Sequence, residues 1–141
     1  MEINNSQKNK GFTLVELLVV TAIISLIGSA IFVQVEQARS KARDAQRERD
    51  VKTLQGALAI YVVNNRTYPV SDPPVALIGS DSVSQELLNK DALPKIPADP
   101  FNYSNYRYIY ASVDGSTYLI TYYLETNTIT GKPAGEHTAA P

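Results

Sequence analysis

Glu16 is the residue whose chemistry most needs an explanation, because it is the only charged side chain between residues 12 and 35. The segment around it is apolar, and an ionised carboxylate in such a segment costs about 3 kcal/mol on membrane-insertion scales. A glutamate one helical turn from the start of the segment can reach the polar boundary, which lowers that cost. It can also pair with a positive charge one turn away.

The other residue types give no support to catalysis or to metal binding. The sequence has no cysteine, which excludes a disulfide, a thiolate metal site and a cysteine nucleophile. Its single histidine, His137, lies in a C-terminal segment rich in Gly, Pro and Ala, where no neighbour is placed to orient a base or to complete a zinc site. We therefore predict no enzyme, no catalytic residue, no cofactor and no metal, and we expect His137 to be solvated.

The overall charge bounds the class of partner. A net charge of -1 and a pI near 5.8 provide no bulk positive field, which argues against nucleic acid as the main ligand. Residues 36 to 52 carry six basic and four acidic side chains, among which Glu48 and Lys52 have the spacing of a helical ion pair. A phosphate-binding surface needs unopposed Lys and Arg, so ion pairs with neighbouring proteins are the better interpretation of this segment.

The apolar segment has the length of a membrane span. As a helix, Phe12 to Val33 would extend about 33 Å, against roughly 30 Å for the hydrocarbon core of a bilayer. A secretory signal would place an A-x-A-like cleavage site after its apolar region, but Ser29-Ala30 has no such pattern. The sequence therefore predicts a retained transmembrane helix over residues 12–35, with Gly28 as its softest point.

A short polar leader, residues 1–11, precedes this helix and ends in Lys8, Lys10 and Gly11. The junction KGFTLVEL resembles the class III signal of type IV prepilins and type II secretion pseudopilins. The resemblance implies that a membrane aspartyl peptidase cuts after Gly11, so that Phe12 becomes an N-methylated N-terminus. Glycine suits the cut position because a residue without Cβ lets the backbone approach a protease cleft closely.

The same resemblance assigns Glu16 to filament assembly, through pairing with the new Phe12 amine within a subunit or between subunits. It implies as partners further copies of the chain, minor pilin subunits, a prepilin peptidase/N-methyltransferase, a membrane assembly platform and the lipid bilayer. The precursor would be a single-pass inner-membrane protein with an extracytoplasmic C-terminal domain, and the assembled filament would be periplasmic or at the cell surface.

One count argues for the opposite orientation. Two lysines precede the span, whereas six basic residues follow it between positions 39 and 52, and an excess of positive charge favours the cytoplasmic side. The second cluster is mixed in sign, although acidic residues count little in this rule. We give the leader motif more weight because it is the stronger evidence.

Beyond the membrane, residues 36–65 are predicted to continue the helix, since they contain no proline. Apolar residues at helical spacing should then face a small domain, namely Val51, Leu54, Leu58 and Tyr61 or Val62. The helix should end near Asn65, ahead of Tyr68-Pro69. Residues 66–100, which hold six of the eight prolines, form a connecting loop with room for a short helix over residues 82 to 90, capped by Ser82.

Residues 101–131 are predicted to form a three-stranded antiparallel sheet. Two tyrosine-rich strands flank an Asp114-Gly115 turn, a third strand covers Thr128 to Thr130, and residues 132–141 form a flexible tail. Tyr106, Tyr108 and Tyr110 alternate onto one face, which favours packing over a stacking platform for sugars or nucleic acid. The expected fold is α+β and pilin-like, with the second half of the long helix packed on the sheet.

The prolines around this sheet extend the resemblance. Tyr68-Pro69 after the helix and Pro97-Ala98-Asp99-Pro100 before the sheet are similar to the major pseudopilin of type II secretion. Calcium is not carried over from that family, because Glu125 and Glu136 are the only carboxylates after Leu124. We expect a structural filament subunit, for type II secretion or for an adhesive, twitching or DNA-uptake pilus. The alternative is an uncleaved bitopic membrane protein whose extracytoplasmic domain binds a partner.

Overall fold

A single long helix, α1 (Leu14–Asn65), runs through 52 residues of the computed structural model, which describes residues 11–141 apart from the side chain of Ala30. The expected leader, residues 1–10, lies outside the described residues. Helix α1 contains no proline, and it ends where Tyr68-Pro69 approaches. These bounds agree with the helix expected over residues 12–65, except that Phe12 and Thr13 precede it.

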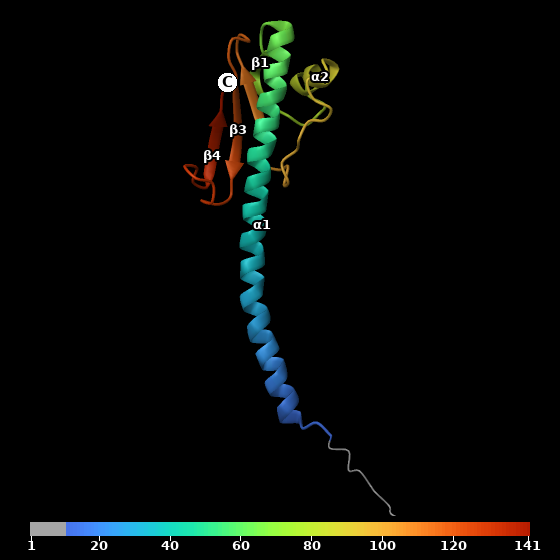
Figure 1. Cartoon of the computed structure of the whole chain (residues 1–141), viewed down its shortest axis with the longest axis vertical. Coiled ribbons are helices and arrows are strands. Elements are labelled where there is room, and N and C mark those ends of the chain that lie inside the picture. Colours follow the sequence, from blue (N-terminus) through green and yellow to red (C-terminus); the bar gives the residue numbers. More distant parts are fainter. Residues whose placement is uncertain (1–10) are drawn as a thin grey trace, which may run out of the picture. The chain divides into compact units, whose positions relative to one another are not determined.

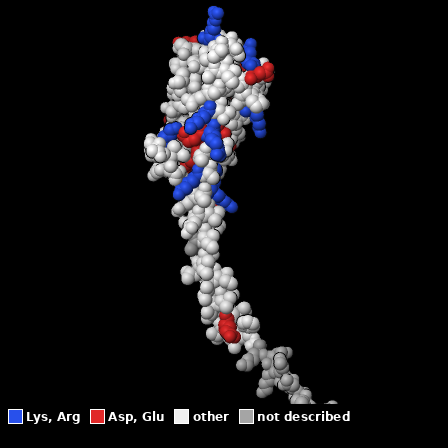
Figure 2. All heavy atoms as spheres, in the orientation of Figure 1, with Lys and Arg blue, Asp and Glu red and all other residues white. Residues whose placement is uncertain are grey.

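The first of two compact units extends as far as Ala38. In the single chain, every large apolar side chain from Phe12 to Val35 is exposed, with exposed fractions between 40% and 89%. Figure 2 shows the surface of this part as almost free of charged atoms. The first half of α1 is long and apolar enough to span a membrane. An apolar helix with no polar face needs a bilayer or other apolar helices around it.

The second unit, Arg39–Pro141, contains a four-stranded antiparallel sheet. Its strands follow one another in sequence order, so each neighbouring pair is joined without a crossover. Helix α2 (Ser82–Asn89) lies between the first two strands in the sequence. Figure 1 shows the sheet beside the second half of α1. The strands are β1 (Ser71–Ala76), β2 (Ile109–Ser112), β3 (Leu119–Leu124) and β4 (Gly135–Ala139).

The core forms where α1 meets one face of the sheet. The predicted stripe on α1 is buried, with Leu54 and Leu58 fully inaccessible. It packs with the buried side chains of β3, namely Ile120, Tyr122 and Leu124, in one hydrophobic cluster. Alternation along β3 directs Thr121 and Tyr123 to the opposite face. The α+β fold and the helix-on-sheet packing are thus confirmed.

The sheet has one strand more than predicted, and two of its strands lie elsewhere. No strand forms at Thr128 to Thr130, where Ile129 makes only an isolated bridge to Lys132. Strand β4 instead lies in the segment 132–141, so the flexible tail was a wrong prediction. The sequence GEHTA gives only a weak indication of a strand, because it is short and contains few residues that favour strands. The segment is ordered by its pairing with β3 over five residue pairs.

Strand β1 was missed because it contains Pro73 and Pro74 within the expected loop. Proline cannot donate to a strand ladder and is therefore confined to sheet edges, which is where β1 lies. The tyrosine prediction holds for two of three residues, since Tyr108 and Tyr110 are buried whereas Tyr106 is half-buried. The Asp114-Gly115 turn joins β2 and β3 as expected, with Gly115 at a φ of 76°.

Candidate functional site

The Gly11–Phe12 junction lies in non-helical backbone immediately before α1. Both residues are exposed, and the Phe12 side chain is 89% accessible. A protease binds its substrate as an extended chain, so a peptide bond outside the helix needs no local unfolding before it is cut. A Cβ built on Gly11 meets no atom within 4 Å, so a larger residue would fit at this position in the isolated chain.

Glu16 and Thr13 form a reciprocal cap at the start of α1. Both the backbone N–H and the Oγ1 hydroxyl of Thr13 donate to Oε2 of Glu16, at 2.9 Å and 2.8 Å. The backbone N–H of Glu16 is in turn 3.2 Å from Thr13 Oγ1. This T-x-x-E pattern is a capping box, which satisfies N–H groups that the first helical turn leaves without partners.

The cap uses only one oxygen of the Glu16 carboxylate. Within the described residues, Oε1 accepts no hydrogen bond, whereas Oε2 accepts two. Oε1 can therefore take a further donor without loss of the cap. We predicted an assembly role for Glu16 but not its bonds to Thr13, although the T-x-x-E spacing is a signal for them.

A second polar site, which we call the Arg47 cluster, lies inside the globular unit. It comprises Arg43, Asp44, Arg47, Asp99 and Glu125. Arg47 is fully buried, and its guanidinium donates to all three carboxylates. The shortest distance is 2.6 Å to both Asp99 and Glu125, and 2.8 Å to Asp44. One side chain of α1 thereby fixes the loop before residue 100 and the loop after β3.

Asp44 and Arg43 complete these attachments. Asp44 accepts the backbone N–H groups of Glu125 and Thr126, at 2.9 Å and 2.8 Å, so it anchors the start of the β3–β4 connection to the helix. Arg43 bonds both oxygens of Glu125, at 2.8 Å and 2.6 Å. The hydrogen bonds from Arg43, followed by those from Arg47, lower the pKa of Glu125 below its ordinary value.

A third contact ties α1 to the end of the sheet. Lys132 Nζ lies 2.8 Å from Oε1 of Glu48 and 2.6 Å from the Tyr122 hydroxyl, which itself donates to Glu48. Glu48 thus pairs with Lys132 across 84 positions, not with Lys52 as its helical spacing suggested. His137 is half-buried, and its ring lies 5.8 Å from that of Tyr122, so the expectation of a solvated histidine was wrong.

For residues 36 to 52 we predicted ion pairs with neighbouring proteins, but the structure pairs Arg43, Arg47 and Glu48 within the chain. The sequence did not predict the Arg47 cluster, because charged residues in a polar helix are ordinarily on the surface. A signal was nonetheless present. Asp44 and Arg47 precede Val51 and Leu54 at helical spacing, so they continue the buried stripe toward the N-terminus of α1. Extending the stripe backwards by one turn would have placed both charges on the core face, where each requires a partner.

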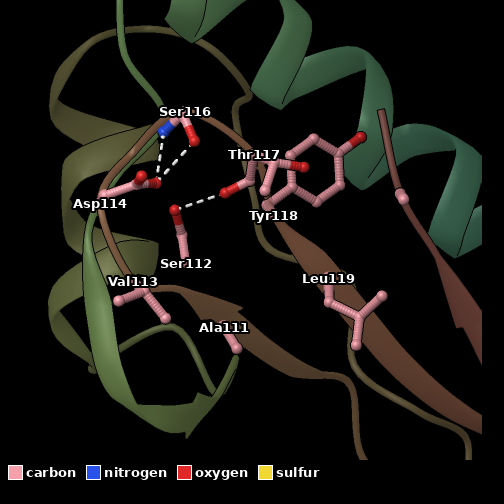
Figure 3. A pocket seen from close by; sticks show the side chains of 9 residues that line it. Ala111, Ser112, Val113, Asp114, Ser116, Thr117, Tyr118 and Leu119 are labelled. Carbon is pink, nitrogen blue, oxygen red and sulfur yellow. Dashed lines mark hydrogen bonds between the residues drawn. The ribbon is translucent and has the colours of Figure 1, made fainter.

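The charged clusters do not provide a metal site. Within the described residues, no group of three His, Cys, Asp or Glu side chains is arranged to hold a metal ion. The three carboxylates of the Arg47 cluster are already bonded by the arginine. A cavity of about 540 Å³ at the β2–β3 hairpin, shown in Figure 3, is lined mostly by apolar groups. Its Ser112 and Ser116 hydroxyls are used within the hairpin, by Thr117 O and Asp114.

An apolar helix that continues into a small domain and packs there against an antiparallel sheet is the architecture of the pilin-like proteins. Two family models match this chain in succession. The prokaryotic N-terminal methylation motif covers residues 6–32, and the type II secretion system (T2SS), protein G family covers residues 33–138. The chain belongs to the type II secretion system protein G family, and it is a structural pseudopilin and not an enzyme.

Curated relatives agree with this assignment. The type II secretion system core protein G of Vibrio cholerae serotype O1 is 26% identical over 137 residues, which cover 95% of this chain and 90% of the relative. The corresponding protein of Pseudomonas aeruginosa is 28% identical over 113 residues, or 77% of this chain and 79% of the relative. That of Escherichia coli K12 is 28% identical over 100 residues, covering 68% and 69%. No solved structure gave a significant match.

Proposed function

We propose that this chain is the precursor of the polymerising subunit of a type II secretion pseudopilus. A prepilin peptidase removes residues 1–11, the same enzyme methylates Phe12, and the assembly platform moves the subunit from the inner membrane into a periplasmic filament. Other copies and minor pseudopilins surround each apolar helix in that filament. The observation that carries this proposal is the exposed Gly11–Phe12 bond, in non-helical backbone directly ahead of a capped apolar helix.

Burial of the exposed helix supplies the driving force. The large apolar side chains between Phe12 and Val35 are 40% or more accessible in the single chain, and copies of this helix can cover them for one another. Removal of the leader creates an ammonium at Phe12, one turn from Glu16. The free Oε1 of that carboxylate can accept this ammonium, from the same subunit or from a neighbour. Pairing lowers the cost of a carboxylate among apolar helices.

The extracytoplasmic orientation rests on the N-terminal motif, against the charge count. Arg43 and Arg47, two of the six basic residues after the span, are ion-paired with carboxylates from distant parts of the chain. The positive-inside rule counts basic residues and gives little weight to acidic ones, so these ion pairs do not change the count. The N-terminal methylation motif over residues 6–32 is the stronger support for the orientation.

Intact-mass measurement after co-expression with a prepilin peptidase tests the proposal. We expect loss of Met1 to Gly11, with or without one added methyl group on Phe12. A Gly11→Leu variant should keep its leader because the bulk blocks the cleft, whereas Gly28→Leu, a matched control within the helix, should be cut. A wild-type chain that still begins at Met1 would reject the proposal in favour of an uncleaved bitopic protein.

A further inference from the structure

The outer face of the sheet carries a cavity of about 210 Å³ with a mixed polar and apolar lining, which has no role in the proposed function. Its floor comes from β2, β3 and β4, and its wall from the loop that precedes β2. Six polar side chains line it: Ser104, Asn105, Arg107, Thr121, Tyr123 and Glu136. The volume is below the roughly 300 to 1,000 Å³ of sites for drug-sized ligands, so it suits one small ring.

These six polar side chains that line the cavity have no hydrogen-bond partner within the described part of the protein. None of the six side chains donates or accepts a hydrogen bond within residues 11–141, in contrast to the polar groups of the Arg47 cluster. Thr121 and Tyr123 are half-buried, so their hydroxyls are less open to water than those of ordinary surface residues. Convergent polar groups without internal partners are the usual feature of a site that binds a polar ligand.

The wall of the cavity is held in place before any ligand binds. Asn102 and Ser104 both adopt left-handed backbone conformations, with φ of 51° and 50°, which non-glycine residues adopt only at some cost. Backbone bonds of 3.0 Å, Tyr106 N to Tyr103 O and Arg107 N to Asn105 O, close the loop. Such a preformed wall lowers the entropy cost of binding.

An aromatic cluster supports the cavity from one side. The Tyr123 ring meets that of Tyr106 edge-on at a centroid distance of 5.3 Å, and Tyr106 in turn lies 4.7 Å from the guanidinium of Arg47. Tyr123 thus offers a positioned ring next to free donors and acceptors. A ligand ring with C–H groups on its faces and hydroxyls at its edges can stack on the Tyr123 ring and bond the neighbouring donors and acceptors.

We propose that this cavity binds one residue of a neutral saccharide. Arg107, Asn105 and Glu136 carry planar groups that can bond adjacent hydroxyls, and the opposite charges of Arg107 and Glu136 favour a ligand without net charge. Glu136 opposes a phosphate backbone, which argues against nucleic acid. An extended peptide would pair with a free strand edge, which the edge strand β4 offers but the central strand β3 of the cavity floor does not.

The cavity lies on the sheet face that does not pack against α1, and saccharide binding there does not require a filament. Residues of β3 alternate, so Thr121 and Tyr123 lie on the face opposite to the one that packs against α1. If the α1 helices form the filament interior, this face points away from them. The cavity would then present a row of equivalent saccharide sites, one on each subunit.

Saturation-transfer NMR on the full chain tests the proposal, in a detergent without a sugar headgroup, with cellotetraose as the probe. We expect transfer to the ring protons of the probe and a millimolar dissociation constant. Arg107→Ala and Thr121→Val should each weaken binding about fivefold, the effect of one lost hydrogen bond. Thr117→Val, an exposed threonine at the far end of the hairpin, should bind as the wild type does.

Three results would overturn the saccharide site. The first is no transfer to cellotetraose from a wild-type chain with its normal circular dichroism spectrum. The second is transfer that Arg107→Ala, Thr121→Val and Glu136→Gln all leave unchanged. The third is competition by tetraalanine or by an oligothymidylate, which would assign the cavity to a peptide or a nucleic acid. None of these results bears on cleavage after Gly11, so the two proposals fail independently.

Discussion

Arg47 and Asp99 are 52 positions apart in the sequence and form a buried, two-bonded ion pair, with Nε 2.6 Å from Oδ2 and Nη2 3.2 Å from Oδ1. The pair joins α1 to the Pro97–Pro100 loop, a segment with no regular secondary structure of its own. Phe101 N–H also donates to Asp99, at 2.8 Å. This loop has no backbone hydrogen bonds of a helix or sheet to hold it. A side chain of α1 positions it instead.

Arg47→Met should strongly destabilise the globular unit. Methionine fills part of the space but leaves the buried carboxylates of Asp44 and Asp99 without their cation, and breaking a buried pair in this way costs about 3 to 5 kcal/mol. Urea unfolding of the full chain in detergent measures the free energy. Arg49→Met, on the exposed side of the same helix, should change it by less than about 0.5 kcal/mol. Equal losses in the two variants would contradict a structural role for the cluster.

The Arg47 cluster also predicts loss of stability in acid. Hydrogen bonds from Arg43 and Arg47 hold the pKa of Glu125 below its ordinary 4.5. A carboxyl whose pKa is lowered by folding adds stability that is fully present above the unfolded pKa and disappears as pH falls through the folded one. The free energy of unfolding should therefore be flat from neutral pH down to about 5 and should fall below 4.5.

Glu125→Gln isolates this contribution. The variant should be less stable than the wild type at pH 7, and the difference between them should shrink as pH falls below 4.5. Glu136→Gln, at an exposed carboxyl that forms no ion pair within residues 11–141, is the matched control and should keep the wild-type pH dependence. A parallel decline in wild type and Glu125→Gln would show that acid acts elsewhere.

Tyr61 predicts a stability change at the opposite end of the pH range. Burial, aided by the hydrogen bond to Glu86, raises its pKa from 10 to about 12. A group with a raised folded pKa stabilises the fold fully below the unfolded value, and that contribution is lost as pH rises through the folded value. Between pH 10 and 12 the wild type should lose more unfolding free energy than Tyr61→Phe. Tyr103→Phe, at an exposed tyrosine, should retain the wild-type loss.

Helix α2 is capped by Asp81 and not by its neighbour Ser82. Ser82 was the predicted cap, but Asp81 holds the position: its carboxylate accepts Ser84 N–H at 2.8 Å and Ile78 N–H at 2.8 Å. Asp81→Ala should lower the free energy of unfolding by about 1 kcal/mol or more. Ser82→Ala should have little effect, because Ser82 is exposed and its side chain makes no hydrogen bond within the described residues. A larger loss from Ser82→Ala would restore the original assignment.

The features that the sequence predicts correctly are those that depend on local periodicity. The stripe from Val51 to Tyr61, the end of α1 before Pro69 and the hairpin at Asp114-Gly115 each follow from a pattern within a dozen residues. The N-terminal methylation motif, which a family model matches over residues 6–32, is likewise local. Local patterns of this kind predict the structure correctly because contacts with distant parts of the chain do not change the conformation that they favour.

The features that the sequence did not reveal depend on partners far along the chain. Strand β4 is ordered by pairing with β3, and Glu48 prefers Lys132 to Lys52 because folding places Lys132 and Tyr122 on the same side of the helix. Similarly, Arg47 can be buried because Asp99 and Glu125, which are distant in the sequence, pair with its guanidinium in the folded protein. Local propensity contains no information on such pairs.

Glu16→Ala should separate processing from assembly. The variant keeps the apolar helix and the Gly11–Phe12 junction, so we expect normal membrane insertion and normal cleavage by the peptidase. It loses the carboxylate for the Phe12 amine and also the acceptor for Thr13, so incorporation into filaments should fall at least about tenfold if the pair is worth about 1.4 kcal/mol. Intact mass measures cleavage, and sheared-filament yield measures incorporation.

Glu16→Gln removes the charge while keeping an oxygen that can still cap Thr13. If the ion pair with the Phe12 amine controls assembly, this variant should be cut normally and assemble as poorly as Glu16→Ala. If the helix cap is what matters, it should assemble like the wild type. Ser25→Ala, which removes a hydroxyl bonded within its own helix to Thr21 O at 2.8 Å, is the control for polar changes in the span. Wild-type filament yield from both Glu16 variants would reject any role of this residue in assembly.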